Sequence, residues 1–316
     1  MAFLRVIAPG MLTTIQDQGR WGWQSRGVPV AGPMDPYCHR LANTLVGNQP
    51  DRATLEVTLV GPEMEFQDER LAAVTGAEFE IAVDGRAQPL NTPFAVSAGS
   101  VLRFGPRRRG ARAYVAVAGG IASPPVLGSR ATHLPSGMGG LNGGPLRAGD
   151  RLPLGKRGAF SPPPAEKGPY PFFAVPDGRA RVRILPGPHA DRLAPDALDG
   201  LQSAPYVLDA SANRMGYRLH GPRLRHAGDA EMLSDATPLG ALQVPAAGEP
   251  ILLMADRQTT GGYPVLATVI SADIRLAGQL APGDSMVFVV SSRREAMAAL
   301  IAQEQSLMAL EPGPRG

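Results

Sequence analysis

The amino-acid sequence predicts a mainly β protein with two β-rich halves. Glycine (38) and proline (32) make up about a fifth of the 316 residues, which favours many turns and short strands over long helices. A turn followed by alternating apolar residues recurs as "AGSVLRF", "AGDRLPL" and "PGDSMVF". A Gly-Pro pair recurs in "LVGPEMEF" and "LHGPRLRH", which indicates two copies of one β architecture.

A proline-rich connector divides the halves. Residues 156–178 carry prolines at 162, 163, 164, 169, 171 and 176, a composition typical of an extended, semi-rigid segment. We therefore predict a first domain over residues 1–165 and a second domain, with a C-terminal helix, over residues 166–316. The recurring turn and strand patterns are also compatible with an exchange of strands between the halves.

Two helices are predicted among the strands. Asp35 and Pro36 form a good N-cap and first-turn pair, and an apolar stripe follows until Gly47. The last helix begins at "SRRE", a capping box from Ser292 to Glu295, and ends before Pro312. We expect each helix to cover a β-barrel.

Composition narrows the classes of function. The chain has a net charge of +3, lysine only at 156 and 167, and no run of 18 apolar residues, so we expect a cytoplasmic protein without membrane contact. The scarcity of lysine argues against a P-loop, a Schiff base and a biotinylated lysine. An anionic ligand would therefore have to be bound by arginine side chains, by backbone amides or by a partner protein. The lone Cys38 lies in the first predicted helix, where core packing is favoured over reactivity.

Several other patterns are better explained by structure than by chemistry. The basic cluster "PRRRGAR" (106–112) lacks interleaved aromatic residues, so we interpret it as a solvated hairpin turn and expect no nucleic-acid binding. The glycine-rich "SGMGGLNGG" (136–144) is interpreted as a flexible loop first and a flap over a site second. The five histidines lack ligand spacing, so no metal site is expected.

Three polar-dense stretches carry the candidate site: residues 13–35, 211–222 and 251–264. Each combines an amide or carboxylate, arginine and glycine, which lets forked donors and bare backbone close on a planar polar ligand. Any one stretch alone is more typical of a structural turn with Asp–Arg pairing. Because the chain has three of them, we predict a shared site to which both halves contribute.

These stretches, with "LANTLVGN", "LEVTLVGPEMEF", "PPVLGSR" and above all "ADRQTTGGYP" beside "NRMGYRL", resemble a known family. It is variously called allophanate hydrolase subunit 2, biotin-dependent carboxyltransferase subdomain, or 5-oxoprolinase C-subunit (KipA-like). The likeness runs from Thr13 to about Phe288 and implies two cyclophilin-like β-barrels with a few short helices. The departures, Gln18, the two tryptophans of "QDQGRWGW" and Pro33, put fine ligand preference in doubt.

The resemblance implies a subunit of an ATP-dependent 5-oxoprolinase, which opens the lactam of 5-oxoproline to glutamate. Its implied partners are a companion subunit of the KipI (allophanate hydrolase subunit 1) type and a lactam-hydrolase subunit, with ATP bound by this chain or its companion. A first alternative is the carboxyltransferase subunit of a biotin-dependent carboxylase acting on urea or a similar amide, with carboxybiotin on a separate carrier. A second alternative is a non-catalytic regulator that binds a kinase-inhibitor protein.

Roles follow from residue type. Arg257 suits a phosphate or carboxylate, Asp256 can orient Arg257 or act as a base, and Gln258 suits the lactam amide, so these three are the predicted catalytic residues. Asp256→Ala and Arg257→Ala are expected to abolish activity and to leave the fold intact. The predicted substrate-binding residues are Thr259, Thr260, Gly261, Gly262, Tyr263, Asn213, Arg214, Met215, Gly216, Gln16, Asp17, Gly19, Arg20 and Asp35.

Overall fold

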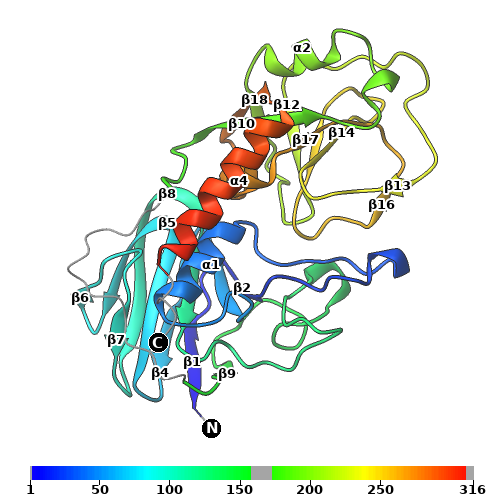
Figure 1. The fold of residues 1–316 in the computed structure, drawn as a ribbon. Coiled ribbons are helices and arrows are strands. Elements are labelled where there is room, and N and C mark those ends of the chain that lie inside the picture. Colours follow the sequence, from blue (N-terminus) through cyan, green and yellow to red (C-terminus); the bar gives the residue numbers. More distant parts are fainter. Residues whose placement is uncertain (1, 158–172, 311–316) are drawn as a thin grey trace. The chain divides into compact units, whose positions relative to one another are not determined.

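The computed structural model describes residues 2–157 and 173–310, which fall into two compact units (Figure 1). The first unit comprises Met1–Arg20, Ala31–Val175 and Gln303–Gly316, and the second comprises Trp21–Val30 and Pro176–Ala302. Residues 21–30 therefore belong to the second unit although they lie in the N-terminal half of the sequence, and residues 303–316 belong to the first unit although they lie at the C-terminal end. Most of the proline-rich connector, including the predicted boundary at 165, lies outside the described residues.

The first unit is a sheet of nine described strands with one α-helix on it. The strand order is β2-β3-β8-β4-β1-β9, and β5 pairs with β6, β7 and β8. The elements are β1 (Phe3–Ala8), β2 (Leu12–Gln16), α1 (Pro36–Leu45), β3 (Thr54–Thr58), β4 (Glu63–Phe66), β5 (Arg70–Val83), β6 (Arg86–Ala87), β7 (Phe94–Val96), β8 (Val101–Val117), the 3₁₀ turn η2 (Leu134–Ser136) and β9 (Arg151–Pro153).

Strand β8 separates two apolar clusters by alternation. Successive side chains of a strand point to opposite faces. Ala113, Val115 and Val117 accordingly join the main core of the unit, whereas Tyr114 and Ala116 pack with α1. This explains how one sheet holds a core on one face and a helix on the other.

Helix α1 begins as the sequence predicts. The Asp35 carboxylate accepts a hydrogen bond from the Cys38 backbone N–H at 2.9 Å, and Pro36 occupies the first turn. Cys38 is fully buried in the apolar cluster, in agreement with the expected packing role. The predicted covering helix and its cap are therefore confirmed.

The second unit contains a closed barrel of seven described strands in the order β10-β17-β14-β15-β12-β11-β18. All its pairings are antiparallel except β10 with β18, which is parallel. A separate two-stranded sheet joins β13 and β16. The strands are β10 (Arg179–Pro186), β11 (Tyr206–Leu208), β12 (Gly216–His220), β13 (Asp235–Ala236), β14 (Ala241–Gln243), β15 (Ile251–Leu253), β16 (Thr260–Gly261), β17 (Val265–Val269) and β18 (Ser285–Val290).

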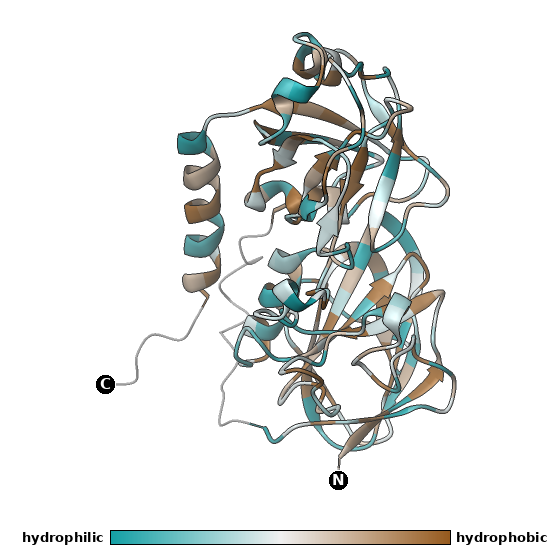
Figure 2. Cartoon of the chain, turned by 90° about the vertical axis from the view of Figure 1, so that its right-hand side faces the viewer, coloured by the Kyte–Doolittle hydropathy of each residue, from teal (hydrophilic) through white to brown (hydrophobic). Residues whose placement is uncertain are grey.

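Short helices and turns complete the second unit. The last helix, α4, begins in the second unit and ends in the first unit. They are η1 (Gln24–Arg26), η4 (Ala190–Arg192), α2 (Ala197–Gln202), η5 (Ser271–Asp273), α3 (Ile274–Gly278) and α4 (Arg293–Met308). The predicted capping box is present, because the Ser292 backbone N–H donates to Glu295 at 2.8 Å and the Glu295 N–H donates to Ser292 Oγ at 3.2 Å. Polar and apolar residues alternate along α4 (Figure 2).

The last turns of α4 belong to the first unit. Glu304 forms two hydrogen bonds with the Arg40 guanidinium of α1, at 2.6 and 2.8 Å, and Leu307 is buried in the apolar cluster around α1. Ser306 lies 3.1 Å from the Tyr37 hydroxyl. The predicted C-terminal helix therefore also packs on a helix.

The prediction for the basic cluster is wrong. Arg107, Arg108 and Arg109 lie within the 17-residue strand β8, where all three are exposed, instead of in a hairpin turn. Carboxylates of the paired strand β5 compensate two of these charges: Arg108 contacts Glu80 at 2.8 Å and Arg109 lies 3.9 Å from Glu78. The mainly β fold class itself is confirmed.

The glycine-rich loop is ordered by close backbone packing. A Cβ atom on Gly139 would overlap the Ala131 carbonyl, and one on Gly140 would overlap the Thr132 side chain. Both glycines also have a positive φ, which disfavours any other residue. The glycines therefore let this loop pack tightly against residues 131 and 132.

Candidate functional site

A cavity of about 350 Å³ in the second unit joins two of the three polar stretches. Residues from 211–216 and from 258–263 form part of its wall, although they are more than 40 positions apart in the chain. The members from these two segments are Ser211, Asn213, Met215, Gly216, Gln258 and Tyr263. Five of these, all except Ser211, are predicted site residues.

Strand residues form the rest of the cavity wall. Arg218 of β12, Gln243 of β14, and Ile251 and Leu253 of β15 line it. The burial pattern of β12 places Tyr217 and Leu219 in the barrel interior and Arg218 outside. The cavity therefore lies against the outer surface of the barrel wall.

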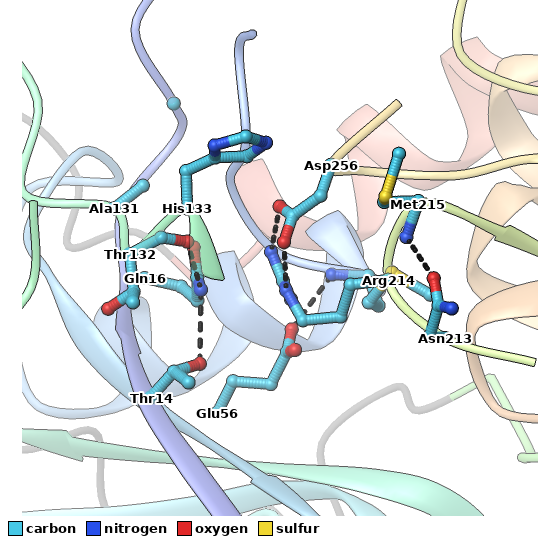
Figure 3. A network of polar contacts seen from close by, with 12 residues as sticks. Thr14, Gln16, Glu56, Ala131, Thr132, His133, Asn213, Arg214, Met215 and Asp256 are labelled. Carbon is cyan, nitrogen blue, oxygen red and sulfur yellow. Dashed lines mark hydrogen bonds and ion pairs between the residues drawn. The ribbon is translucent and has the colours of Figure 1, made fainter. Parts of the chain in front are cut away.

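Arg214 and Asp256 form a buried ion pair. The Arg214 Nε and Nη2 atoms donate to the two Asp256 carboxylate oxygens at 3.0 and 2.9 Å (Figure 3), and the side chains are 4% and 1% exposed. The backbone continues the β12–β15 ladder here, because the Asp256 N–H donates to the Arg214 carbonyl at 2.8 Å. A bidentate pair of this kind fixes both loops, and breaking a buried pair is strongly destabilising.

Arg257 differs from its neighbour because no described carboxylate pairs with it. Its side chain is 9% exposed, and its Nε donates to the Thr237 carbonyl at 2.9 Å. Burial lowers the pKa of the Arg257 guanidinium to about 10. A buried cation without an anionic partner favours binding of an anion or of a developing negative charge.

The "TTGG" segment is held by a second strand-like segment. Residues 235–236 pair with 260–261, the Thr237 N–H donates to the Thr259 carbonyl at 3.0 Å, and the Thr237 hydroxyl donates to the Gln258 carbonyl. Gly261 is required for space, since a Cβ atom there would lie 2.5 Å from the Gln243 Nε2. Gly261 thus lets the backbone approach the cavity residue Gln243, and the approach of backbone to a ligand stays a prediction.

In the first unit, Gln16 is fully buried at the end of β2. Its Nε2 donates to the Thr14 hydroxyl at 3.0 Å and to the Thr132 carbonyl at 3.1 Å (Figure 3). Its Oε1 is buried without a hydrogen-bond partner in the described part of the chain. A buried acceptor left open in this way is costly unless a ligand or water binds it.

Asp17 and Arg20 organise the loop that follows β2. The Asp17 carboxylate accepts hydrogen bonds from the Gly19 N–H at 2.9 Å and from the Ser129 hydroxyl and Arg130 N–H, both at 2.5 Å. Arg20 Nη2 donates to the Ala131 carbonyl at 2.5 Å, and the side chain is 1% exposed. Gly19 adopts a positive φ of 87°. These contacts fasten the loop to residues 129–131, and only the Gly19–Asp17 hydrogen bond is local.

Asp35 belongs to a buried polar cluster that sequence reasoning did not find. Its backbone N–H donates to the Tyr114 hydroxyl at 2.8 Å, and that hydroxyl donates to Glu56 at 2.7 Å. Burial and the nearby carboxylates of Glu56 and Asp35 raise the pKa of Tyr114 well above its ordinary value. Only the register of β3 against β8 brings Glu56 opposite Tyr114, so no local signal could have revealed this pair.

The structure thus brings several of the predicted residues together within each unit, whereas Asp35 lies at the N-cap of α1 beside Tyr114. In the second unit, Arg214 pairs with Asp256, and residues of both stretches line one cavity. In the first unit, Gln16, Asp17 and Arg20 all contact residues 129–132. The convergence of the two sets on one ligand stays a prediction.

Comparison with known proteins identifies the family. Residues 26–290 match the model described as "Carboxyltransferase domain, subdomain A and B". The chain belongs to this carboxyltransferase domain family. The match covers most of both units, including the 211–216 and 256–263 loops.

Relatives within the family bear two kinds of name. The 5-oxoprolinase C-subunit of Escherichia coli is 40% identical over 302 residues, which cover 96% of each chain. Urea amidolyase of Saccharomyces cerevisiae is 33% identical over 98% of this chain, but this chain spans only 18% of that protein. The crystal structure of the K. lactis urea amidolyase matches with a TM-score of 0.90 at 32% identity, over 98% of this chain and 20% of that one.

The described residues were also compared with the requirements of a membrane-spanning helix and of a metal site. No described helix is long and apolar enough to cross a membrane. Within the same residues, histidine, cysteine, aspartate and glutamate side chains form no group of three or more suited to a metal ion.

Proposed function

We propose that this chain is a subunit of an ATP-dependent 5-oxoprolinase, which opens the lactam ring of 5-oxoproline to give glutamate. The observation that carries the proposal is the 40% identity to the E. coli 5-oxoprolinase C-subunit along 96% of both chains. Such a role implies companions, and we infer a companion barrel subunit of the KipI type and a lactam-hydrolase subunit. Cytoplasmic location is part of the same proposal.

The cavity of the second unit suits an amide substrate. An amide carbonyl is a poor electrophile, so its opening needs stabilisation of negative charge on the oxygen. Arg257 precedes the cavity residue Gln258 and is buried without a described carboxylate partner, and we assign its guanidinium to this purpose. Gln258 lines the cavity, and Gly261 lets its backbone pack closely against the amide of the cavity residue Gln243. Asp256 holds Arg214 and so fixes the geometry of the loop.

The donor set of this chain fits a phosphate or a carboxylate better than a whole nucleotide. Arg257 is the buried cation that would contact an anionic group, and residues 258–263 show no P-loop pattern. ATP, when bound to the assembled enzyme, supplies the phosphoryl group that activates the amide oxygen. We assign its main binding surface to the companion subunit.

A second candidate function is transfer of a carboxyl group from carboxybiotin to urea or a similar amide. The description of the family and the TM-score of 0.90 to the K. lactis urea amidolyase favour it. In that reaction the cavity would hold a ureido group, and Arg257 would stabilise its oxygen. The biotin carrier and the carboxylase would be separate proteins.

Reconstitution distinguishes the two functions. The chain would be co-purified with its companion subunits, and ADP and glutamate release would be measured with and without 5-oxoproline. We expect 5-oxoproline-dependent ATP hydrolysis by the complex and little or none by the chain alone. A complex that is silent with 5-oxoproline but fixes bicarbonate onto urea in an avidin-sensitive reaction would overturn the proposal in favour of the second candidate.

A further inference from the structure

Two cavity residues that are not among the predicted site residues, Arg218 and Gln243, lie in one row across three neighbouring strands. Arg218 of β12 is the register partner of Ile251 in β15, and Ile251 is the register partner of Gln243 in β14. Directly opposite residues point to the same face of a sheet. Neighbouring strands lie roughly 4.8 Å apart, so the two Cα atoms are separated by about 10 Å. Both side chains line the same cavity.

Gln243 presents a hydrogen-bond acceptor to the cavity. The residue is 2% exposed, and its Nε2 donates to the Tyr263 carbonyl at 3.4 Å. The opposite orientation of the amide would set its oxygen against that carbonyl, so this contact fixes the amide. The Oε1 atom accepts no hydrogen bond from the described residues. It is therefore available to a ligand N–H.

Other amides near the cavity are less suited to this task. Asn213 uses both ends of its side chain locally, since Oδ1 accepts from the Met215 N–H at 2.8 Å and Nδ2 donates to the Ser211 carbonyl at 3.1 Å. Gln258 is exposed and can be hydrated. A buried amide discriminates more strongly than an exposed one, because the wrong ligand leaves its polar group unpaired without water.

Arg218 presents a cation to the same cavity. Its guanidinium has no ion pair or hydrogen bond with the described residues, whereas Arg214, four positions earlier, is paired with Asp256. An arginine fork is suited to a carboxylate. A neutral molecule such as urea has no group that requires it.

We propose that Gln243 and Arg218 determine substrate specificity, Gln243 by accepting the ring N–H of a lactam and Arg218 by binding a carboxylate on the carbon next to that nitrogen. This inference rests on the proposed 5-oxoprolinase function and deepens it. In 5-oxoproline the ring N–H and the carboxylate are adjacent, so one small molecule satisfies both groups of the row. The second candidate substrate, urea, satisfies only Gln243.

The test compares substrate analogues on the reconstituted complex. The lactone analogue of 5-oxoproline, with oxygen in place of the N–H, and 2-pyrrolidinone, without the carboxylate, would be assayed as inhibitors of 5-oxoproline-dependent ATP hydrolysis. For the wild-type complex we expect each inhibition constant to exceed the KM for 5-oxoproline at least 10-fold. Gln243→Met should raise this KM about 10- to 100-fold and remove most of the preference over the lactone. Arg218→Gln should also raise this KM about 10- to 100-fold, and it should remove most of the preference over 2-pyrrolidinone.

Controls separate specificity from folding. Gln202→Met is matched to Gln243→Met, because the Gln202 amide accepts the Val290 N–H at 2.9 Å and is not part of the cavity wall. It should leave KM and both preferences unchanged. Thermal midpoints and co-purification with the companions would show that every variant is folded and assembled.

Two negative results have different meanings. A wild-type complex without 5-oxoproline-dependent ATP hydrolysis would contradict the proposed function, and the specificity inference would fall with it. An active wild-type complex whose preferences persist in Gln243→Met and Arg218→Gln would contradict the specificity inference alone.

Discussion

The polar loop after β2 in the first unit and the polar loops beside the cavity in the second unit have similar compositions but different uses. Asp17 directs its carboxylate at three neighbouring donors, and Arg20 donates to a backbone carbonyl. In the second unit, Arg218 and Arg257 have no described carboxylate partner, and Gln243 keeps an unused acceptor. Polar density alone therefore does not mark a site. The hydrogen-bonding capacity that remains after folding does.

Two adjacent residues of the motif "ADRQTTGGYP", Asp256 and Arg257, show the same contrast between a side chain that is already paired and one that is not. Asp256 is committed to Arg214, as Asp17 is committed to its loop, whereas its neighbour Arg257 remains available. The expectation that Asp256→Ala leaves the fold intact is therefore revised. A carboxylate that is 1% exposed and bidentate to a buried arginine is part of the core.

The largest expected effect on stability is that of Asp256→Ala. It would remove the bidentate carboxylate partner of a buried arginine, Arg214, which costs about 3–5 kcal/mol in the free energy of unfolding. Urea denaturation of the chain would measure the loss. The double variant Arg214→Met/Asp256→Leu should recover most of it, and equal losses in the single and double variants would show that the ion pair is not the cause.

Arg257→Ala should separate function from stability. We expect kcat/KM of the assembled enzyme to fall about 10²- to 10³-fold, as for the loss of one group that stabilises a developing oxyanion. Stability should change by only about 1 kcal/mol, because one hydrogen bond to a carbonyl is lost. Arg225→Ala, at an exposed arginine paired with Asp196, is the matched control and should leave both quantities unchanged. Wild-type turnover of Arg257→Ala would remove Arg257 from the mechanism.

The first unit should show a pH dependence that originates in its core. His39 is fully buried, and burial lowers its pKa from 6.5 to about 4. Between these values the unfolded chain binds a proton that the folded chain does not, so stability present above pH 6.5 is lost as the pH falls towards 4. The loss amounts to roughly 3 kcal/mol. Urea denaturation from about pH 7.5 to 4 would measure it, and His39→Gln should flatten the profile; an equally steep profile in that variant would assign the effect to carboxylates.

Asp17→Ala should have the smallest effect on catalysis. Its three hydrogen bonds lie within the first unit, so stability should fall by about 1–3 kcal/mol while KM for 5-oxoproline stays within about twofold. Thermal unfolding and steady-state kinetics would be compared on one preparation. A large rise in KM at unchanged stability would restore Asp17 as a substrate-binding residue. It would also show that the loop after β2 and the loops beside the cavity do not differ in use.

Local signals predicted the parts of the fold that depend on neighbours in sequence. The Asp35 cap, the Ser292–Glu295 capping box and the strand-like runs all follow from residues within a few positions of one another. The placement of Arg107–Arg109 in a strand was missed because it depends on backbone pairing with residues of β5 that lie about 30 positions away in the sequence.

The site was predictable only where glycine and polar residues cluster. Residues 211–216 and 258–263 were found in this way, and they share one cavity. Arg218 lies within the predicted stretch 211–222 but is not among its predicted site residues, and Gln243 is a single polar residue in an otherwise apolar strand outside all three stretches. Only the registers of β12, β15 and β14 bring them into one row.

The position of the cavity on the outer surface of the second barrel decouples ligand choice from folding. Tyr217, Leu252 and Leu242 form the buried row adjacent to Arg218, Ile251 and Gln243, so alternate residues of the same three strands serve the interior and the cavity. A library randomised at Arg218 and Gln243 would leave the barrel interior intact. The residues that face the cavity can therefore be exchanged while the adjacent interior row of the same strands is left unchanged.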